Sequence, residues 1–396
     1  MFKRIRVKAR KPYELITDQI YRSMPQIQKV ESGVAVLLRA SGSAVGSLTV
    51  NENADPSVRD DFEAAIPRVV KDFGGKIKND SLFGYLQGAM MSNALTLVIS
   101  RGRFVFGTWQ GIYANTHGKK MSSYNHDIDV FVVPCKHKSS LTSYTAKSRG
   151  SHIIDDDVLK EYVKSPLIFL SVLHTSASLS ISYPGASNLE TKLNRIAPAR
   201  WNREFLTHTY EGDDDMPGHL KSSICGVSLA IPSEFLRKSA SRIQLNEHRD
   251  CGGWGGGHTR KISCLGVAPT ISKTISNVPV GKITNLILKY VDEMKKLHNQ
   301  VKVGIVVVSV ANPDCGVKLA SSSFLHSDLT SFFTSLADGD LRMGLTICGR
   351  STCLPFESKR GVYFGGDDDD DDDRKNELFL LGNKKSQSDV FIGLLS

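Results

Sequence analysis

The sequence contains no C-x-x-C pair and no hydrophobic run near the ~20 residues that span a bilayer. Its seven cysteines are scattered, which argues against a disulfide framework and against a zinc ribbon. Residues 1–10 are basic but lack an apolar signal core, and the alternation over Ile5–Ala9 is typical of a strand rather than of a targeting peptide. We therefore expect a protein without membrane contacts that resides in the cytoplasm.

Signatures of nucleic-acid binding are also missing, although the formal net charge is +9. This excess of cations persists despite the aspartate run 367–373, which we expect to be a solvated loop, with weak calcium binding as the alternative. No basic helix or aromatic-studded strand accompanies the charge, so nucleic acid is not the expected partner. A positive surface attracts anions, and a small phosphorylated ligand fits it.

The chain of 396 residues is long enough for two or three domains, and it repeats itself three times. Each repeat contains a buried-type strand, a turn of small residues and an alternating strand, at 36–53, 167–182 and 305–320. A helical pattern precedes each pair, at 14–28, 155–164 and 283–298, and further helices are expected from Asp55 onward and at 328–336. More strands close the units, at 95–107, at 227–232 with 242–245, and at 344–355 with 361–364. This mixture predicts an α+β fold for each unit.

Polar segments separate the repeats. We expect linkers at 137–157 and 268–281, which gives units at 1–136, 155–268 and 281–396. A glycine-rich run at 252–257 is expected to be a hairpin tip, with a phosphate-cradling loop as the alternative.

The segment 208–223 has the densest concentration of chemically active side chains, with two histidines, four carboxylates and a lysine before an apolar run. Histidine and aspartate bind divalent metals or move protons near neutral pH, and Lys221 has the charge to hold a phosphate. For Asp213–Asp215 alone, the alternative is a solvated acidic turn. The flanking His208 and His219 favour a functional site.

Several long strings resemble those of a known family. They are N-E-N-A-D-P at 51–56, G-T-W-Q-G-I-Y at 107–113, H-T-S at 174–176, the whole segment 208–223 and E-H-R at 247–249. Together they resemble the YjbQ-like secondary thiamine-phosphate synthase family, whose single-domain members form trimers. The resemblance implies three tandem YjbQ-like domains that form an internal trimer with pseudo-threefold symmetry, and hence a monomer in solution.

The family's motifs are divided between the units. The first unit keeps the first two strings but has Ser43 where the family has histidine, and the second keeps the others but has S-Y-P at 182–184 in place of N-E-N. The third has Asn312 at the histidine position and keeps none of the polar strings. In a homotrimer whose site lies between subunits, fusion of three copies lets each copy lose the half that it no longer supplies. We therefore expect one composite site, between units one and two.

Candidate ligands of a divalent metal, whether zinc, magnesium or manganese, are His174, His208, His219 and Asp215, with Glu211 as an alternative to Asp215. For His174 alone, a turn histidine bonded to the backbone is the alternative. Lys221 and Arg249 are expected to hold phosphate oxygens, and Glu52 or Glu247 to act as general base. The expected ligand-binding residues are Asn51, Trp109, Gln110, Thr175 and Ser176, where Trp109 would stack on a heterocycle unless it belongs to the core.

The resemblance implies thiamine-phosphate synthesis, in which a thiazole phosphate nitrogen attacks a pyrimidine methyl diphosphate and pyrophosphate leaves. Such a reaction needs neutralisation of the leaving group and alignment of two rings. The same residues would suit metal-assisted phosphoester hydrolysis. A non-catalytic ligand-binding or scaffold protein is the alternative from another class, but random decay would not retain complementary halves in two units.

Overall fold

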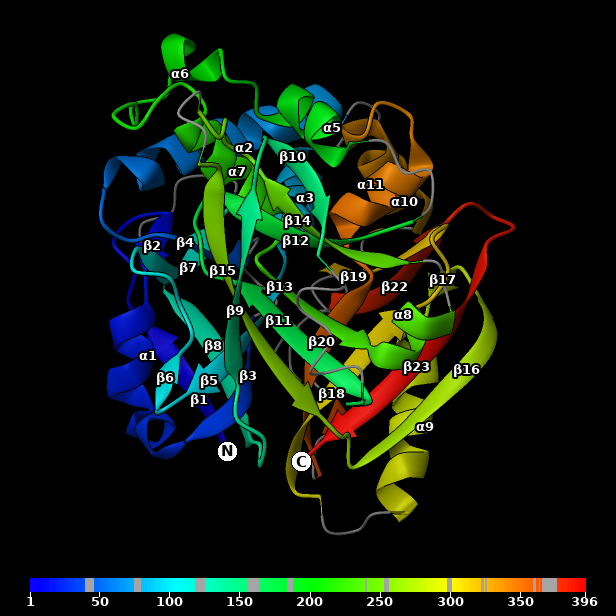
Figure 1. The fold of residues 1–396 in the computed structure, drawn as a ribbon. Helices are drawn as coiled ribbons and strands as arrows, with labels where there is room; N and C mark the ends of the chain where they lie inside the picture. Colours follow the sequence, from blue (N-terminus) through cyan, green and yellow to red (C-terminus); the bar gives the residue numbers. More distant parts are fainter. Residues whose placement is uncertain are drawn as a thin grey trace.

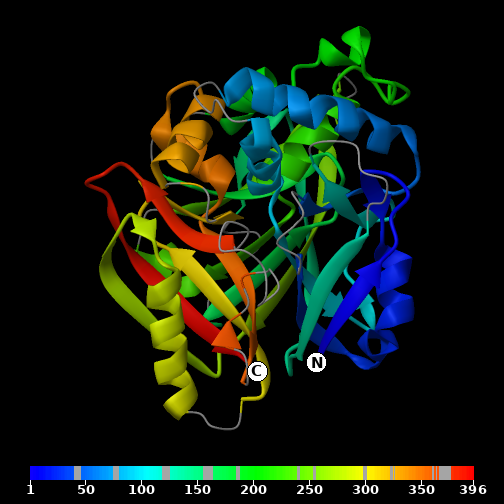
Figure 2. The same cartoon turned by 180° about the vertical axis from the view of Figure 1, so that it is seen from behind.

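The computed structural model describes residues 1–39, 46–74, 80–117, 125–154, 164–183, 188–238, 241–252, 256–297, 301–321, 324, 326–358, 361–362, 364 and 376–396. Its strands form antiparallel sheets, and most of its helices lie at one end of the molecule (Figures 1 and 2). This mixed content confirms the α+β prediction. Among the described residues, no helix is both long and apolar enough to cross a membrane. The predictions for Ser43, for 253–255 and for 367–373 lie outside the described residues.

The described residues form six sheets, which fall into three pairs with one common strand order. The first pair consists of a five-stranded sheet, β1-β8-β3-β5-β6, and a three-stranded sheet, β2-β7-β4. Its strands are β1 (Phe2–Val7), β2 (Tyr13–Leu15), β3 (Ser32–Arg39), β4 (Gly46–Glu52), β5 (Ala94–Ser100), β6 (Arg103–Phe104), β7 (Gln110–Thr116) and β8 (His126–Pro134).

The second pair has the orders β9-β15-β11-β13 and β10-β14-β12, and the third has β16-β23-β18-β20-β21 and β17-β22-β19. The second-pair strands are β9 (Ser140–Ala146), β10 (Gly150–Ile153), β11 (Leu167–Val172), β12 (Ala177–Ser182), β13 (Ser228–Pro232), β14 (Arg242–Glu247) and β15 (His258–Val267). The third-pair strands are β16 (Ile271–Pro279), β17 (Gly281–Lys282), β18 (Val303–Val310), β19 (Cys315–Ser321), β20 (Ser351–Glu357), β21 (Gly361–Val362), β22 (Asn376–Gly382) and β23 (Gln387–Leu395). The three repeated strand pairs predicted from the sequence are β3-β4, β11-β12 and β18-β19.

The predicted linkers are wrong. Strands β9 and β10 lie within 137–157, and β16 fills most of 268–281. Strand β9 pairs with β15 and β16 pairs with β23, so each is the outer strand of the next sheet and begins before the expected unit boundary. Edge strands carry many polar side chains because one edge has no neighbouring strand. Their composition therefore resembles that of a loop.

The helices depart from prediction at two places. The pattern at 14–28 becomes the end of β2, helix α1 (Thr17–Ser23) and a 3-10 helix (Pro25–Lys29), because a proline inside a helix breaks it. The segment 344–355 divides into helix α11 (Leu341–Cys348) and β20, with Gly349 between them at φ 100°. Periodicity does not separate a short buried helix from a buried strand. The helix expected at 155–164 lies almost entirely outside the described residues.

The other helices follow the sequence patterns more closely. Helix α2 (Ser57–Phe73) begins one residue after Pro56, and Ser57 N donates to Asp55 Oδ1 over 2.8 Å, so Asp55 caps it as expected. Helices α9 and α10 fall at the predicted third-unit positions. The bounds of the rest of the helices are α3 (Asp80–Met91), α5 (Leu189–Ile196), α6 (Trp201–Glu204), α7 (Asp215–Cys225), α8 (Ser233–Lys238), α9 (Thr284–Leu297) and α10 (His326–Leu336).

The three large sheets meet at one apolar cluster. Their middle strands β3, β11 and β18 contribute to it in the same way, and its members include Val34, Val36, Leu167, Phe169, Ile305 and Val307. Each such side chain contributes about 1.5–3 kcal/mol on full burial. The three sheet pairs are therefore held around a common centre.

A second apolar cluster joins the helices that cover the small sheets. Helices of all three sheet pairs contribute to it: α2 and α3 of the first, α5, α6 and α7 of the second, and α10 and α11 of the third. Figures 1 and 2 show these helices side by side at one end of the molecule. Within this layer, α7 of the second pair packs against α2 and β4 of the first. That contact brings the two sets of predicted site residues together.

Candidate functional site

Three buried side chains converge where α7 begins. Asp215 and His219 are four residues apart and share one face of α7, while His208 lies in the turn before it. Asp215 Oδ2 is 3.0 Å from His208 Nε2 and 3.4 Å from His219 Nε2. One possible ligand atom from each residue lies within 4.8 Å of the others. We call these three residues the triad.

The turn that carries His208 is anchored by the first sheet pair. The Asp61 carboxylate on α2 accepts hydrogen bonds from Thr207 N at 2.8 and 2.9 Å, and from His208 N at 2.8 Å. Asp61 is buried on the apolar face of α2, so it has little access to water. A carboxylate with several backbone donors is strongly held. The position of His208 therefore depends on both sheet pairs.

The Nδ1 atoms of His208 and His219 point away from Asp215, and each lies next to a hydrogen-bond acceptor. His219 Nδ1 is 3.2 Å from the Thr175 carbonyl, and His208 Nδ1 is 3.0 Å from Asp55 Oδ2. Since these oxygens can only accept, both Nδ1 atoms carry the hydrogen. In a neutral ring, Nε2 then has a lone pair. Both Nε2 atoms face Asp215 Oδ2. With neutral rings, all three atoms would be acceptors, so a proton or a cation is needed between them.

The electrostatics of the triad reflect this need. Burial opposes the charged form of His208, but its hydrogen bonds to Asp215 and Asp55 raise its pKa overall. Burial likewise opposes the charged form of Asp215, but the contacts with His208, His219 and Arg249 hold its pKa well below the ordinary value. Without a metal, a proton on His208 balances the buried carboxylate. A divalent cation would replace that proton.

Two residues of the N-E-N string complete the first pair's contribution. Asn51 Nδ2 donates to the His219 carbonyl at 2.9 Å and to Ser223 Oγ at 2.7 Å. Glu52 is buried beside the triad, and burial raises its pKa despite a hydrogen bond from Ala54 N and the nearby His219 and His208. A carboxylate with a raised pKa is suited to proton transfer. The structure therefore brings Asn51 and Glu52 to the histidines of the second pair.

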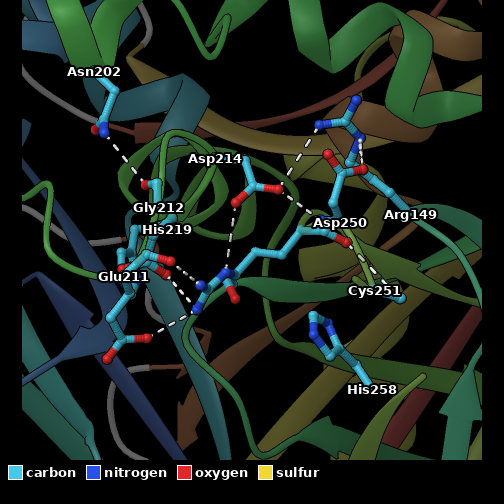
Figure 3. Close-up of polar contacts among 12 residues, drawn as sticks. Arg149, Asn202, Glu211, Gly212, Asp214, His219, Asp250, Cys251 and His258 are labelled. Carbon is cyan, nitrogen blue, oxygen red and sulfur yellow. Dashed lines mark hydrogen bonds and ion pairs between the residues drawn. The ribbon is translucent and has the colours of Figure 1, made fainter. Parts of the chain in front are cut away.

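Arg249 closes one side of the triad. Its Nη1 lies 2.9 Å from Asp215 Oδ1 and 2.9 Å from Glu211 Oε2. Around it, Arg149 lies 3.9 Å from Asp214 and 3.5 Å from Asp250, and Figure 3 shows both carboxylates directed toward the Arg149 guanidinium. Arg249 is thus engaged by carboxylates rather than free to hold a phosphate. Glu211 contacts this arginine and is not in the triad.

His174 lies near the triad but not in it. Ser176 N donates to His174 Nδ1 over 3.2 Å, which matches the turn-histidine alternative. Burial lowers the pKa of His174 to about 3, so the ring is neutral at ordinary pH. The first pair supports this turn, because Gln110 Nε2 donates to the His174 carbonyl over 2.8 Å. Thr175 contributes its carbonyl to His219, as described above.

Two predicted charged residues lie in separate buried networks. The Lys221 side chain is 1% exposed and its Nζ donates to Glu190 Oε1 at 2.7 Å and to Asn194 Oδ1 at 2.6 Å. Glu247 is fully buried and accepts from Arg260 Nη2 over 2.7 Å. The phosphate role of Lys221 and the base role of Glu247 therefore do not fit this arrangement, because each charge already has a buried partner.

Trp109 is 58% exposed, so it is not a core residue. It directly precedes Gln110, whose amide reaches the His174 turn. Tyr210, in the turn between His208 and α7, is also exposed, at 87%. Two aromatic side chains are thus accessible on segments that adjoin the triad, one from each sheet pair.

Sequence reasoning misses two carboxylates that hold the site, Asp55 and Asp61, and also Glu190, which pairs with Lys221 away from the triad. The sequence indicates Asp55 only as a helix cap. One signal existed for Asp61, because it falls on the apolar stripe of α2 between Val58 and Ala65. A charged residue on such a stripe needs a buried partner. No local pattern connects Glu190 with Lys221, 31 residues away.

Comparison with known proteins agrees with the repeated strings. A profile of the family described as "UPF0047 protein YjbQ-like" matches residues 3–128 and 139–249. The UPF0047 protein YjbQ of Escherichia coli O157:H7 is 36% identical over 109 residues, 26% of this chain and 78% of that protein. The UPF0047 protein MJ1081 of Methanocaldococcus jannaschii is 29% identical over 116 residues, 28% of this chain and 82% of that protein.

A crystal structure of a YjbQ/UPF0047 family protein from Clostridium acetobutylicum is 25% identical, with 33% of this chain and 97% of that chain covered and a TM-score of 0.27. The third sheet pair, which begins at Ile271, lies outside both segments matched by the family profile. Those two segments together make up more than half of the sequence. The chain therefore belongs to the UPF0047 family of YjbQ-like proteins and contains the family's fold in repeated form.

Proposed function

We propose that the triad binds one divalent metal ion and that this ion serves chemistry on a small phosphorylated ligand. The supporting observation is the convergence of two imidazole Nε2 atoms on Asp215 Oδ2, at 3.0 and 3.4 Å, while both Nδ1 atoms are bound to acceptors. In a tetrahedral zinc site with bonds of ~2.0–2.1 Å, ligand atoms lie about 3.3 Å apart. Histidine ligands of metals usually donate their other nitrogen to a carboxylate or a carbonyl, as here.

The choice of metal follows from the donor atoms. Two imidazoles and one carboxylate suit zinc, and then manganese, better than magnesium, which prefers oxygen ligands and keeps several waters. Three protein ligands leave a position for a ligand, as in catalytic rather than structural zinc sites. When bound, the ion would supply positive charge to phosphate oxygens. The charge of the ion would replace that of Lys221 and Arg249, which are already paired with carboxylates.

Within this proposal the chain's residues have distinct tasks. Glu52 accepts or returns a proton next to the triad, because its buried carboxylate has a raised pKa. Asp55 and the Thr175 carbonyl orient the imidazoles. Arg249 orients Asp215 through Oδ1 and leaves Oδ2 toward the histidines. These tasks support metal-assisted acid–base chemistry such as phosphoester hydrolysis.

A second candidate is the thiamine-phosphate synthase reaction that the sequence resemblance implies. The observation that favours it is the exposure of Trp109, which leaves its indole available to stack on a planar heterocycle. Ring alignment and neutralisation of the leaving diphosphate are the main demands of that transfer. A non-catalytic binding protein would use the same contacts without turnover.

Metal binding is tested first. Chelator-treated protein is titrated by calorimetry with zinc, manganese and magnesium, and we expect one zinc ion per chain, bound more tightly than magnesium. His219→Ala should weaken zinc binding by a large factor. The matched control is His152→Ala, which removes a histidine of the second sheet pair outside the triad. No zinc binding by the unaltered protein, or equal losses in the two variants, would contradict the proposal.

Chemistry is tested next, on the zinc-loaded protein. Release of phosphate or pyrophosphate is followed with single phosphorylated heterocycles and with a pyrimidine methyl diphosphate plus thiazole phosphate. Phosphate release from single compounds supports hydrolysis, and pyrophosphate release only from the pair supports transfer. Ligand binding without product in either assay identifies the non-catalytic alternative. Glu52→Gln should abolish product formation but retain zinc.

We also propose that the third sheet pair is a diverged family copy and that the chain is monomeric. The support is the shared strand order of the three pairs and the apolar cluster at their centre. Light scattering should give a mass near 43.5 kDa. A stable trimer of the full chain would refute an internal trimer.

A further inference from the structure

A cavity of about 120 Å³ lies where the three sheet pairs meet, and its lining does not include the triad. Equivalent pieces of all three pairs line it, each the end of a helix, a turn and the start of the next strand, at 91–92 with 94–96, at 222–230 and at 347–353. The turn residues Ser92, Gly226 and Gly349 have φ values of 85°, 88° and 100°. The cavity is therefore a feature of the threefold repeat rather than of the metal site.

Backbone hydrogen bonds allow the positions around this cavity to be matched. Leu48 N donates to the Ser92 carbonyl at 2.9 Å, and Leu179 N donates to the Gly226 carbonyl at 3.1 Å. In the third pair, Val317 N donates to the Gly349 carbonyl at 3.1 Å. The residues that follow the three donors therefore occupy equivalent positions in the three sheet pairs. The residues that follow the three acceptors do so too.

This matching shows that the third pair differs in charge. Lys318 occupies the position of Thr49 and Ser180, and Arg350 occupies that of Asn93 and Val227. Both cationic residues line the cavity, and no Asp or Glu does so in the described part of the chain. The third pair, which has none of the polar family strings, is therefore the one that brings positive charge to the centre of the molecule.

The Lys318 ammonium group has little compensation. The side chain is 7% exposed, and its Nζ donates to the Cys348 carbonyl at a long 3.4 Å. The ammonium group also lies over the face of the Phe333 ring, 5.4 Å from the ring centroid. An ammonium group has three hydrogens to donate. Burial without a counter-charge lowers its pKa.

The Arg350 guanidinium is compensated only in part: burial lowers its pKa to about 10, although the nearby Tyr183 and Asp314 act in the opposite direction. It is 2% exposed, and its Nη1 donates to Ser241 Oγ at 3.2 Å. Its Nε and Nη2 have no hydrogen-bond partner among the described residues. Arginine keeps its charge in proteins, and a buried charge without a partner is strongly unfavourable. Two buried cations next to one cavity therefore call for an anion inside it.

We propose that this central cavity binds a small inorganic oxyanion of the sulfate or phosphate class, held by Lys318 and Arg350. A cavity needs about 10–15 Å³ for one water, so the available volume admits an anion of several atoms. Threonine and serine hydroxyls of the lining, such as Thr49 and Ser351, add donors. The anion would link the three sheet pairs electrostatically, and this role does not depend on the proposed metal chemistry.

The test uses the full chain after chelator treatment, so that no metal can hold the anion. Thermal unfolding and calorimetry follow a titration with sodium sulfate, with sodium chloride at matched ionic strength as the reference. We expect saturable stabilisation by sulfate, and at least tenfold weaker sulfate binding in Lys318→Met and Arg350→Gln. The matched control Lys261→Met, an exposed lysine on β15, should bind sulfate like the unaltered protein.

The proposal would be overturned if the unaltered protein showed no saturable sulfate binding, or if Lys318→Met bound sulfate as tightly as the unaltered protein. Should the variants fail to fold, crystals of the unaltered protein grown with selenate decide the question. A selenium anomalous peak between Lys318 and Arg350 supports the site, and peaks confined to other places refute it.

Discussion

Asn51, at the end of a strand in the first sheet pair, donates a 2.9 Å hydrogen bond to the backbone carbonyl of His219, on a helix of the second pair. The same amide nitrogen reaches Ser223 Oγ, one helical turn further on. A single side chain thus fixes α7 along the boundary between two repeats. The triad is a product of that boundary, since its supports come from both sides.

The Asn51 contact should be important for stability. Asn51→Ala removes two hydrogen bonds from a fully buried position, which costs about 1–3 kcal/mol. Urea unfolding of the metal-free protein measures this loss. Asn53→Ala is the matched control, because Asn53 is exposed although it also bonds a carbonyl, that of Gln110. Equal losses for the two variants would show that the boundary contact has no special weight.

Asp55 should determine metal affinity without touching the metal. Its Oδ2 holds His208 Nδ1 at 3.0 Å and so directs Nε2 toward Asp215. Loss of such a partner typically weakens metal binding about 10–100-fold. We expect Asp55→Asn to show a loss of this size for zinc, measured by competition with a chromophoric chelator at pH 8. Asp60→Asn, an exposed neighbour on α2, should leave the affinity unchanged.

Zinc affinity should fall on acidification. Burial opposes the charged form of His208, but its hydrogen bonds to Asp215 and Asp55 raise its pKa above the ordinary 6.5. Protons therefore compete with the metal already at a pH higher than for a free imidazole, and the competition grows as the pH decreases. Calorimetry from pH 8 to pH 5.5 should show decreasing apparent affinity and proton release on binding. A flat profile would exclude histidine ligation.

A buried histidine outside the triad should make the fold sensitive to acid. Burial, together with the nearby Arg39, lowers the pKa of His117 to about 3. The unfolded chain binds a proton near pH 6.5 and the folded chain does not, so stability is lost as the pH falls below 6.5. At pH 5 this amounts to about 2 kcal/mol. The free energy of unfolding is measured at pH 7.5 and at pH 5 with a chelator present. Between these two pH values, His117→Gln should lose about 2 kcal/mol less than the unaltered protein.

The sequence predicts the repeated strand pairs well, because alternation and buried runs are local properties. It does not predict β9 and β16, since edge strands have the composition of loops. For the site, His208, Asp215 and His219 share one short segment, so their proximity could be inferred. The ion pair of Lys221 with Glu190 could not, because it depends on how α7 packs against α5. His174 satisfied both a ligand and a turn interpretation, and only geometry separates them.

The composite nature of the site should appear as non-additivity. Glu52 belongs to the first sheet pair and His219 to the second, yet the charge of one influences the protonation of the other. Groups that act as a unit give a double variant little worse than the worse single variant, whereas independent groups give additive losses. Turnover or ligand affinity of the zinc-loaded protein should therefore fall about equally in His219→Ala and in Glu52→Gln combined with His219→Ala.

The control cycle combines Glu52→Gln with His152→Ala, a histidine of the second pair outside the triad, and its effects should add. The effects of Glu52→Gln and Asn312→Ala should also add. Asn312 lies in the third pair, and its side chain donates to the Gln387 carbonyl, far along the chain from the triad. Additivity of Glu52 and His219 within about 0.5 kcal/mol would mean that they act independently. The N-E-N string would then be a relic of the ancestral site, and the triad would belong to the second sheet pair alone.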